Sequence, residues 1–145
     1  MTTLNVYLTF NGHCKEAFNF YQSVFGGEFS NVSTFGEMPP QEGMPPLSEK
    51  DKNKIMHIAL PISKETILMG CDTGGEWATN FQEGNNFSLS VSTDNKKEAD
   101  RLFNQLSEGG KVTMPMNQTF WGSYFGMFID KFGISWMVSF EEANQ

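Results

Sequence analysis

The chain has 145 residues, the length of one domain, which is enough to bury roughly 68–70% of its unfolded surface. Its formal net charge is −7 and no basic stripe occurs, so binding to nucleic acid or to an anionic membrane is disfavoured. No apolar run approaches the ~20 residues of a membrane-spanning helix. The start has no basic segment typical of a secretory signal, and Cys14 and Cys71 lack metal-like spacing. These features predict a cytoplasmic protein with two free thiols.

The first half of the chain predicts a strand, a helix and three further strands. Alternating apolar residues predict a strand over 4–10, and apolar residues at helical spacing predict a helix over 13–25 that Gly26 and Gly27 end. The other strands of this half are expected at 28–35, 54–62 and 65–71. Loop 36–53 holds four of the six prolines and is long for a compact domain, so we expect either a functional lid or a disordered segment.

After a glycine-rich loop at 72–85, the second half repeats this order. A strand at 86–92 leads into a helix at 95–108, for which Asp94 is the expected N-cap. Its last three strands are expected at 110–114, 120–130 and 134–140. Both halves read βαβββ, and this long period predicts two copies of a small module in one α+β domain. The modules are expected at about 1–72 and about 86–140 of a single domain, 1–145.

Strand parity predicts which side chains lie away from the helices. His57 lies opposite an apolar set that suits helix packing: Met56, Ile58, Leu60 and Ile62. Asn5 and Tyr7 on the first strand and Asn86 in the second module are expected on the same kind of face. If both sheets curl around a shared interior, these faces line it. In the last strand, parity alone sends Trp136 to the core, and the sequence leaves its orientation open.

Several runs of the sequence resemble one protein family over nearly the whole chain. They are Y-L-T-F-N-G-H-C-K-E-A-F-N-F-Y-Q-S-V-F-G-G-E, I-M-H-I-A-L, L-M-G-C-D and T-F-W-G-S-Y-F-G-M-F-I-D-K-F-G-I-S-W-M-V. They resemble the PhnB-like branch of the vicinal oxygen chelate superfamily, often labelled 3-demethylubiquinone-9 3-methyltransferase. The superfamily includes glyoxalase I, bleomycin-resistance proteins and extradiol dioxygenases. The resemblance implies a glyoxalase-like fold, with paired βαβββ modules forming a cupped mixed sheet, helices outside, and a homodimer.

The resemblance also implies where a metal would bind. In metal-dependent members, four inward side chains hold one divalent ion, and by position they fall here at Asn5, His57, Asn86 and Trp136. Amides bind metals weakly and an indole has no lone pair to give. The resemblance therefore implies a degenerate site with His57 as a weak metal candidate and no expected cofactor, although a divalent metal is possible.

A ligand pocket follows from the same comparison, which turns Trp136 inward against its parity. The expected ligand-binding residues are Tyr7, His57, Asn86, Trp121 and Trp136, an aromatic pocket for a flat or apolar small molecule. His57 and Asp72 are the catalytic candidates. Asp72 could pair with His57 or act as a base, or it could simply close the end of a strand.

Four functions are considered at this point, and the last of them is a purely structural interaction module. The first is a small-molecule-binding protein without a metal, and the second is a divalent-metal-dependent lyase, isomerase or dioxygenase that uses His57. A literal methyltransferase is disfavoured, because no G-x-G-x-G loop follows a strand and no doubly wound βα pattern occurs. Whether the chain catalyses any reaction stays open.

Overall fold

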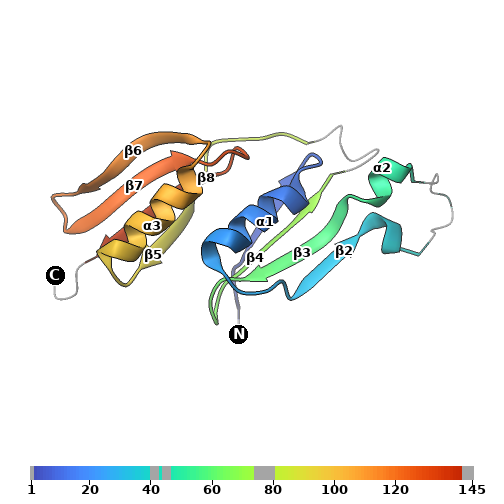
Figure 1. Ribbon diagram of the computed structural model, residues 1–145, viewed down its shortest axis with the longest axis horizontal. Helices are drawn as coiled ribbons and strands as arrows, with labels where there is room; N and C mark the ends of the chain where they lie inside the picture. Colours follow the sequence, from blue (N-terminus) through green and yellow to red (C-terminus); the bar gives the residue numbers. More distant parts are fainter. Residues whose placement is uncertain (1, 40–42, 44–46, 74–80, 142–145) are drawn as a thin grey trace. The chain divides into compact units, whose positions relative to one another are not determined.

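The computed structural model describes residues 2–39, 43, 47–73 and 81–141. The chain divides into two compact units, residues 1–82 and residues 83–145. In each unit, one 12-residue helix lies along one face of a four-stranded mixed sheet (Figure 1). The predicted α+β class and the two βαβββ modules are confirmed.

The first unit is built around α1 and the sheet that we call sheet one. Its elements are β1 (Val6–Phe10), α1 (Cys14–Phe25), β2 (Asn31–Thr34), η1 (Phe35–Glu37), α2 (Glu49–Lys52), β3 (Ile55–Pro61) and β4 (Ile67–Asp72). Sheet one has the order β1-β4-β3-β2, with β1 parallel to β4 and the other neighbours antiparallel. The apolar stripe of α1 is buried as its helical spacing predicts: Cys14, Ala17, Phe18, Tyr21 and Val24.

The second unit repeats this topology around α3 and sheet two. Its elements are β5 (Leu89–Thr93), α3 (Lys96–Ser107), β6 (Lys111–Gln118), β7 (Ser123–Ile129) and β8 (Ser135–Glu141). Sheet two has the order β5-β8-β7-β6, with β5 parallel to β8. The expected N-cap of α3 is wrong by one residue, because Asn95 accepts a hydrogen bond from the backbone N–H of Glu98 at 2.8 Å.

Several predicted boundaries shift for identifiable reasons. Leu4 is 95% exposed and precedes β1, while Asn86 lies before β5 rather than within it. β6 continues to Gln118 past Pro115, because it is an edge strand whose register with β7 shifts twice. Part of loop 36–53 forms η1 and α2; its residues 40–42 and 44–46, like residues 74–80, lie outside the described part of the chain.

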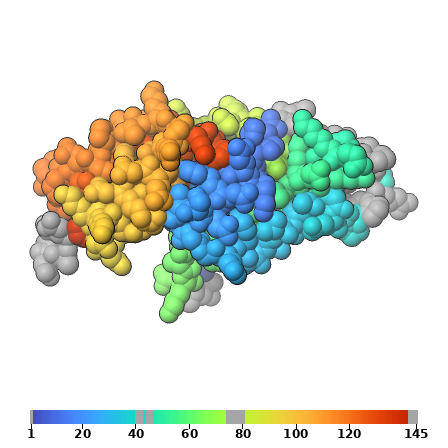
Figure 2. Space-filling view, viewed as in Figure 1, coloured from blue at the N-terminus to red at the C-terminus, as the bar shows by residue number. Residues whose placement is uncertain are grey.

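Two glycines identify the face of each sheet that its helix covers. A Cβ added at Gly70 would lie 2.7 Å from the ring of Phe18 on α1, and one added at Gly126 would lie 2.8 Å from the ring of Phe103 on α3. Side chains at alternate positions of the same strands therefore point to the other, helix-free face. In the space-filling view, the atoms of each helix hide part of the sheet behind it (Figure 2). No helix within the described ranges is long and apolar enough to cross a membrane.

Candidate functional site

The helix-free face of sheet one carries a group of polar and aromatic side chains. Gly70 points at α1 and pairs with both Leu8 and Ile58, so the residues beside these three point away from the helix. The side chains on this face are Tyr7 and Thr9 from β1, Met69 and Cys71 from β4, His57 and Ala59 from β3, and Asn31 and Ser33 from β2. The strands thus bring together residues from four separate segments of the chain.

Tyr7 and His57 form the centre of this face. Their ring centroids are 5.9 Å apart, with the ring planes tilted by 48°. Tyr7 remains 48% exposed and His57 is half-buried, so neither residue is fully enclosed in the core. Both residues were predicted for the site, and the structure places them in contact.

Asn31 is a site residue that the sequence analysis missed. Its side-chain nitrogen lies 2.8 Å from Nδ1 of His57, and its side-chain oxygen accepts a hydrogen bond from the Ser33 hydroxyl at 3.5 Å. In β2 the parity of Asn31 and Ser33 was readable, but the register that sets Ser33 opposite His57 was not.

The phenol of Tyr7 stays protonated in this setting. Partial desolvation of the phenol, followed by its hydrogen bond to Cys71, raises the pKa of Tyr7 to about 12. Cys71 is also 4.0 Å from the hydroxyl of Thr9. Cys14 lies on the helix side, where burial and the nearby Asp72 carboxylate raise the pKa of its thiol. Tyr7 is therefore a neutral hydroxyl at physiological pH.

Asp72 is not beside His57, because it points to the helix side of β4. It is 4% exposed, and its carboxylate accepts three backbone hydrogen bonds, from Gly12 at 3.0 Å and from Cys14 and Ile55 at 2.9 Å. The carboxylate thus connects the start of α1 to the start of β3. Asp72 therefore closes the end of strand β4, and it does not pair with His57.

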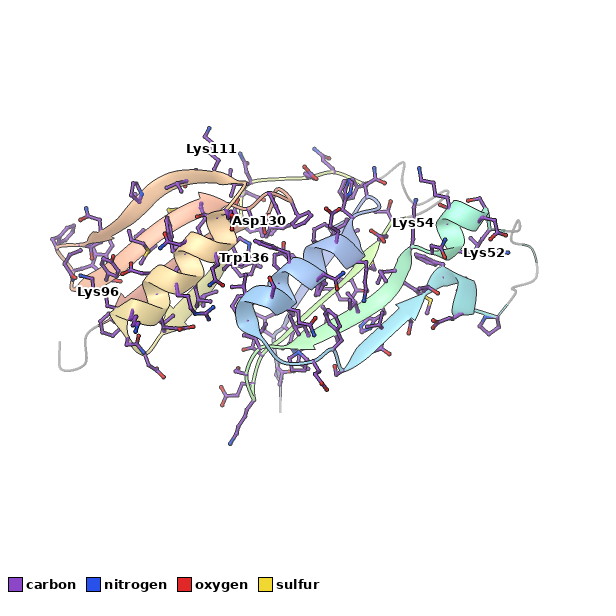
Figure 3. The ribbon with its side chains drawn as sticks, in the orientation of Figure 1. Lys52, Lys54, Lys96, Lys111, Asp130 and Trp136 are labelled. Atoms are coloured by element: carbon purple, nitrogen blue, oxygen red, sulfur yellow. The ribbon has the colours of Figure 1, made fainter. Side chains whose placement is uncertain are left out.

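The inward placement of Trp136 is wrong, and strand parity alone was right. Trp136 is 2% exposed and pairs with Phe128, whose ring stacks edge-on against Phe103 of α3 at 5.2 Å. Its indole N–H donates to Oδ2 of Asp130 at 2.8 Å, and Figure 3 shows the two side chains next to each other. Trp136 is therefore a core residue under α3, because packing against the helix and a buried hydrogen-bond acceptor are both available on that side.

The other predicted site residues occupy varied positions. Asn5 uses its side-chain oxygen to accept the backbone N–H of Ile67 at 3.0 Å. Asn86 is exposed ahead of β5, and Trp121 is 59% exposed in the turn between β6 and β7, with its ring edge-on to Phe120. Among the described residues, no three His, Cys, Asp or Glu side chains gather closely enough to hold a metal ion.

Several solved structures share the fold of this chain. Solved structures with the same fold include a glyoxalase/bleomycin resistance protein/dioxygenase family enzyme from Burkholderia phytofirmans PsJN, at 15% identity and a TM-score of 0.60. They also include the fosfomycin resistance protein FosX from Listeria monocytogenes, described in complex with Mn(II) and a sulfate ion, at 10% identity and a TM-score of 0.62. The fold is thus that of the glyoxalase/bleomycin resistance/dioxygenase superfamily, as expected.

The chain belongs to the 3-demethylubiquinone-9 3-methyltransferase family, whose model matches residues 2–139. It is 31% identical to protein YjdN of Escherichia coli K12 over 141 residues, covering 94% of this chain and 93% of that protein. The structure of protein PA1353 from Pseudomonas aeruginosa is 40% identical, with a TM-score of 0.83, and covers 97% of this chain and 98% of that one. The PhnB protein from Bacillus cereus is 26% identical, with a TM-score of 0.73, and covers 96% and 99%. The resemblance to the PhnB-like branch is confirmed.

Proposed function

We propose that this protein binds a small, flat molecule on the helix-free face of sheet one, through Tyr7 and His57 and without a metal ion. The contact between these two rings is the observation that carries the proposal. The tyrosine ring offers a flat apolar surface, and the imidazole beside it offers one directional polar group. A largely apolar surface with a few placed polar groups is typical of small-molecule sites.

The side chains at the four metal positions of the superfamily do not suit a divalent ion. The Asn5 oxygen already accepts a backbone hydrogen bond, and the Trp136 nitrogen can only donate. His57 is a good ligand, but the residue at another of these positions, Asn86, is a neutral amide without the charge that divalent ions favour. This donor chemistry supports binding without a metal.

Trp136 leaves the proposed set of ligand contacts, because its ring is in the core. Trp121 and Asn86 are exposed in the second unit and remain predictions from the resemblance, apart from the site proposed on sheet one. A cytoplasmic location and a homodimer remain predictions from composition and from the resemblance.

A second candidate function is a divalent-metal-dependent lyase, isomerase or dioxygenase built on His57. The presence of Mn(II) in the complex described for FosX favours testing it, because the two proteins share a fold. The family's description names methyl transfer, but this sequence has no G-x-G-x-G cofactor loop after a strand, so methyl transfer is not proposed.

The two candidates are separated by NMR of protein labelled at histidine. The chain has two histidines, and His13 is exposed at the start of α1, so it serves as an internal control. We expect acetophenone, benzamide or 2-naphthoate to shift the His57 signals and leave His13 in place, with dissociation constants on the order of 1 mM for such small probes. His57→Ala should weaken the binding of these probes, as measured by the shifts of the Tyr7 signals.

Manganese provides the opposing measurement. Equimolar Mn²⁺ should broaden the His57 signals no more than those of His13. Selective broadening of the His57 signals, together with Mn²⁺ binding that is lost in His57→Ala, would replace the proposal by the metal-dependent one. If none of the three aromatic probes shifts His57, the binding face itself is wrong.

A further inference from the structure

We propose that Asn31 is a positioning residue that fixes His57 in the tautomer with its proton on Nε2, so that the site selects ligands carrying a hydrogen-bond acceptor. The preferred ligand would be flat and would present a carbonyl, carboxylate or phenolate oxygen to His57. The ligand preference rests on the proposed function, whereas the tautomer of His57 does not.

The hydrogen bond between Asn31 and His57 determines where the imidazole proton lies. The atom of Asn31 next to His57 is the amide nitrogen, at 2.8 Å from Nδ1. An amide nitrogen can only donate, so Nδ1 must accept and the neutral ring carries its proton on Nε2.

Ser33 sets the orientation of the Asn31 amide. Its hydroxyl donates to the Asn31 oxygen at 3.5 Å, which leaves the amide nitrogen facing His57. Asn31, Ser33 and His57 all lie on the helix-free face, where β2 pairs with β3. The three side chains therefore form a chain in which the serine orients the amide and the amide orients the imidazole.

This arrangement gives the site a defined polarity. Since Nδ1 is occupied by Asn31, the polar atom of His57 left for a ligand is Nε2, which donates. Tyr7 beside it contributes the face of its ring, and its hydroxyl keeps its proton because its pKa is raised. A buried or half-buried donor strongly prefers a ligand that accepts, because an unpaired donor loses its hydrogen bond to water.

The tautomer can be measured without any ligand. In histidine-labelled protein at about pH 8, the ¹⁵N signals of His57 should show an unprotonated Nδ1 and a protonated Nε2. In Asn31→Asp, the carboxylate can only accept, so the proton should move to Nδ1 and the two signals should exchange character. Asn31→Ala should give a mixture of both tautomers. Because Asn31 is exposed on the edge strand β2, these variants should fold, and unchanged His13 signals would verify it.

The ligand preference is tested with two probes of the same shape. Acetophenone has a carbonyl oxygen where α-methylstyrene has a methylene group, so the pair differs in the acceptor alone. We expect the wild-type protein to bind acetophenone about tenfold more tightly, the equivalent of one hydrogen bond, and Asn31→Asp to lose this preference. His13→Gln should keep it.

The outcomes separate the two proposals. A wild-type His57 with its proton on Nδ1, or a tautomer unchanged in Asn31→Asp, would overturn the role of Asn31 even if acetophenone binds. Equal binding of the two probes by wild-type protein would overturn the acceptor preference. The expected tautomer together with no binding of any aromatic probe would instead refute the proposed function and leave the role of Asn31 standing.

Discussion

The indole N–H of Trp136 donates to the carboxylate of Asp130 at 2.8 Å, and both side chains are buried. The other carboxylate oxygen of Asp130 accepts the backbone N–H groups of Phe132 and Ile134 at 2.8 and 3.0 Å. One carboxylate thus closes the turn between β7 and β8 and also holds the ring of Trp136 in the core. Trp136, which was expected to line a ligand pocket, instead stabilises the hairpin to which it belongs.

Removing this carboxylate should destabilise the second unit. Asp130→Ala leaves the backbone and indole donors without their charged acceptor, and should cost about 3 kcal/mol. Trp136→Phe loses one donor and some buried area, and should cost about 1–2 kcal/mol. Urea unfolding measures both, and Trp121→Phe, at the exposed turn, is the matched control with little effect. Losses below about 0.5 kcal/mol in both core variants would contradict the structure.

Asp72 should prove structural when it is made neutral. Asp72→Asn keeps the size of the side chain, but its NH₂ group cannot accept the backbone hydrogen bonds that the carboxylate accepts, and we expect a loss of about 2–3 kcal/mol in urea unfolding. The NMR signals of His57 should stay where they are, because Asp72 points to the opposite face. Asp94→Asn, at an exposed carboxylate, is the control. A large change at His57 without loss of stability would restore a role for Asp72 at the site.

The ionisation of Tyr7 should be visible at high pH. Its pKa is raised to about 12, against an ordinary value near 10 in the unfolded chain, so between these values the folded state holds a proton that the unfolded state has lost. The stability that Tyr7 contributes is complete below about pH 10 and disappears as the pH rises through about 12. Titration by phenolate absorbance should assign this late step to Tyr7 by its absence in Tyr7→Phe. A Tyr7 step near pH 10 would contradict the burial and hydrogen bonding described.

Adding a methyl group under either helix should disturb packing. Ile58 and Gly70 pair across β3 and β4, and in the second unit Gly126 and Val138 pair across β7 and β8. Each pair sets a large side chain opposite a glycine under the helix. The glycine is on the last strand, β4, in the first unit, but on the strand before the last, β7, in the second. Gly70→Ala and Gly126→Ala should each cost about 1–3 kcal/mol, because the new methyl group would contact backbone as well as ring atoms.

The control for these variants is Gly84→Ala, where the added Cβ would lie 3.8 Å from the Asn86 side chain. Thermal unfolding of the three variants provides the comparison. If Gly70→Ala and Gly126→Ala unfold at the wild-type temperature, the close approach of Phe18 and Phe103 to the sheets is incorrect.

The repeat, the helices and most strands were readable from the sequence because each rests on local periodicity. The buried positions of α1 and α3 follow a 3.6-residue spacing, and the parity of β3 placed His57 on the helix-free face. The boundary errors at β5 and β6 arose where an exposed Phe87 and a tolerated Pro115 run against local preference.

The site was only partly readable, since it depends on how strands pair. The sequence by itself determined two βαβββ modules and the faces of Tyr7 and His57, because alternation along a strand is a property of the chain. Only the tertiary structure decided that Asn31 meets His57, because β2 reaches β3 across 26 residues of sequence. It also decided that Trp136 belongs to the core. Asp130 provides a buried hydrogen-bond acceptor on the helix side of sheet two. Because a buried indole N–H without a partner costs free energy, the orientation of Trp136 toward that side is the stable one.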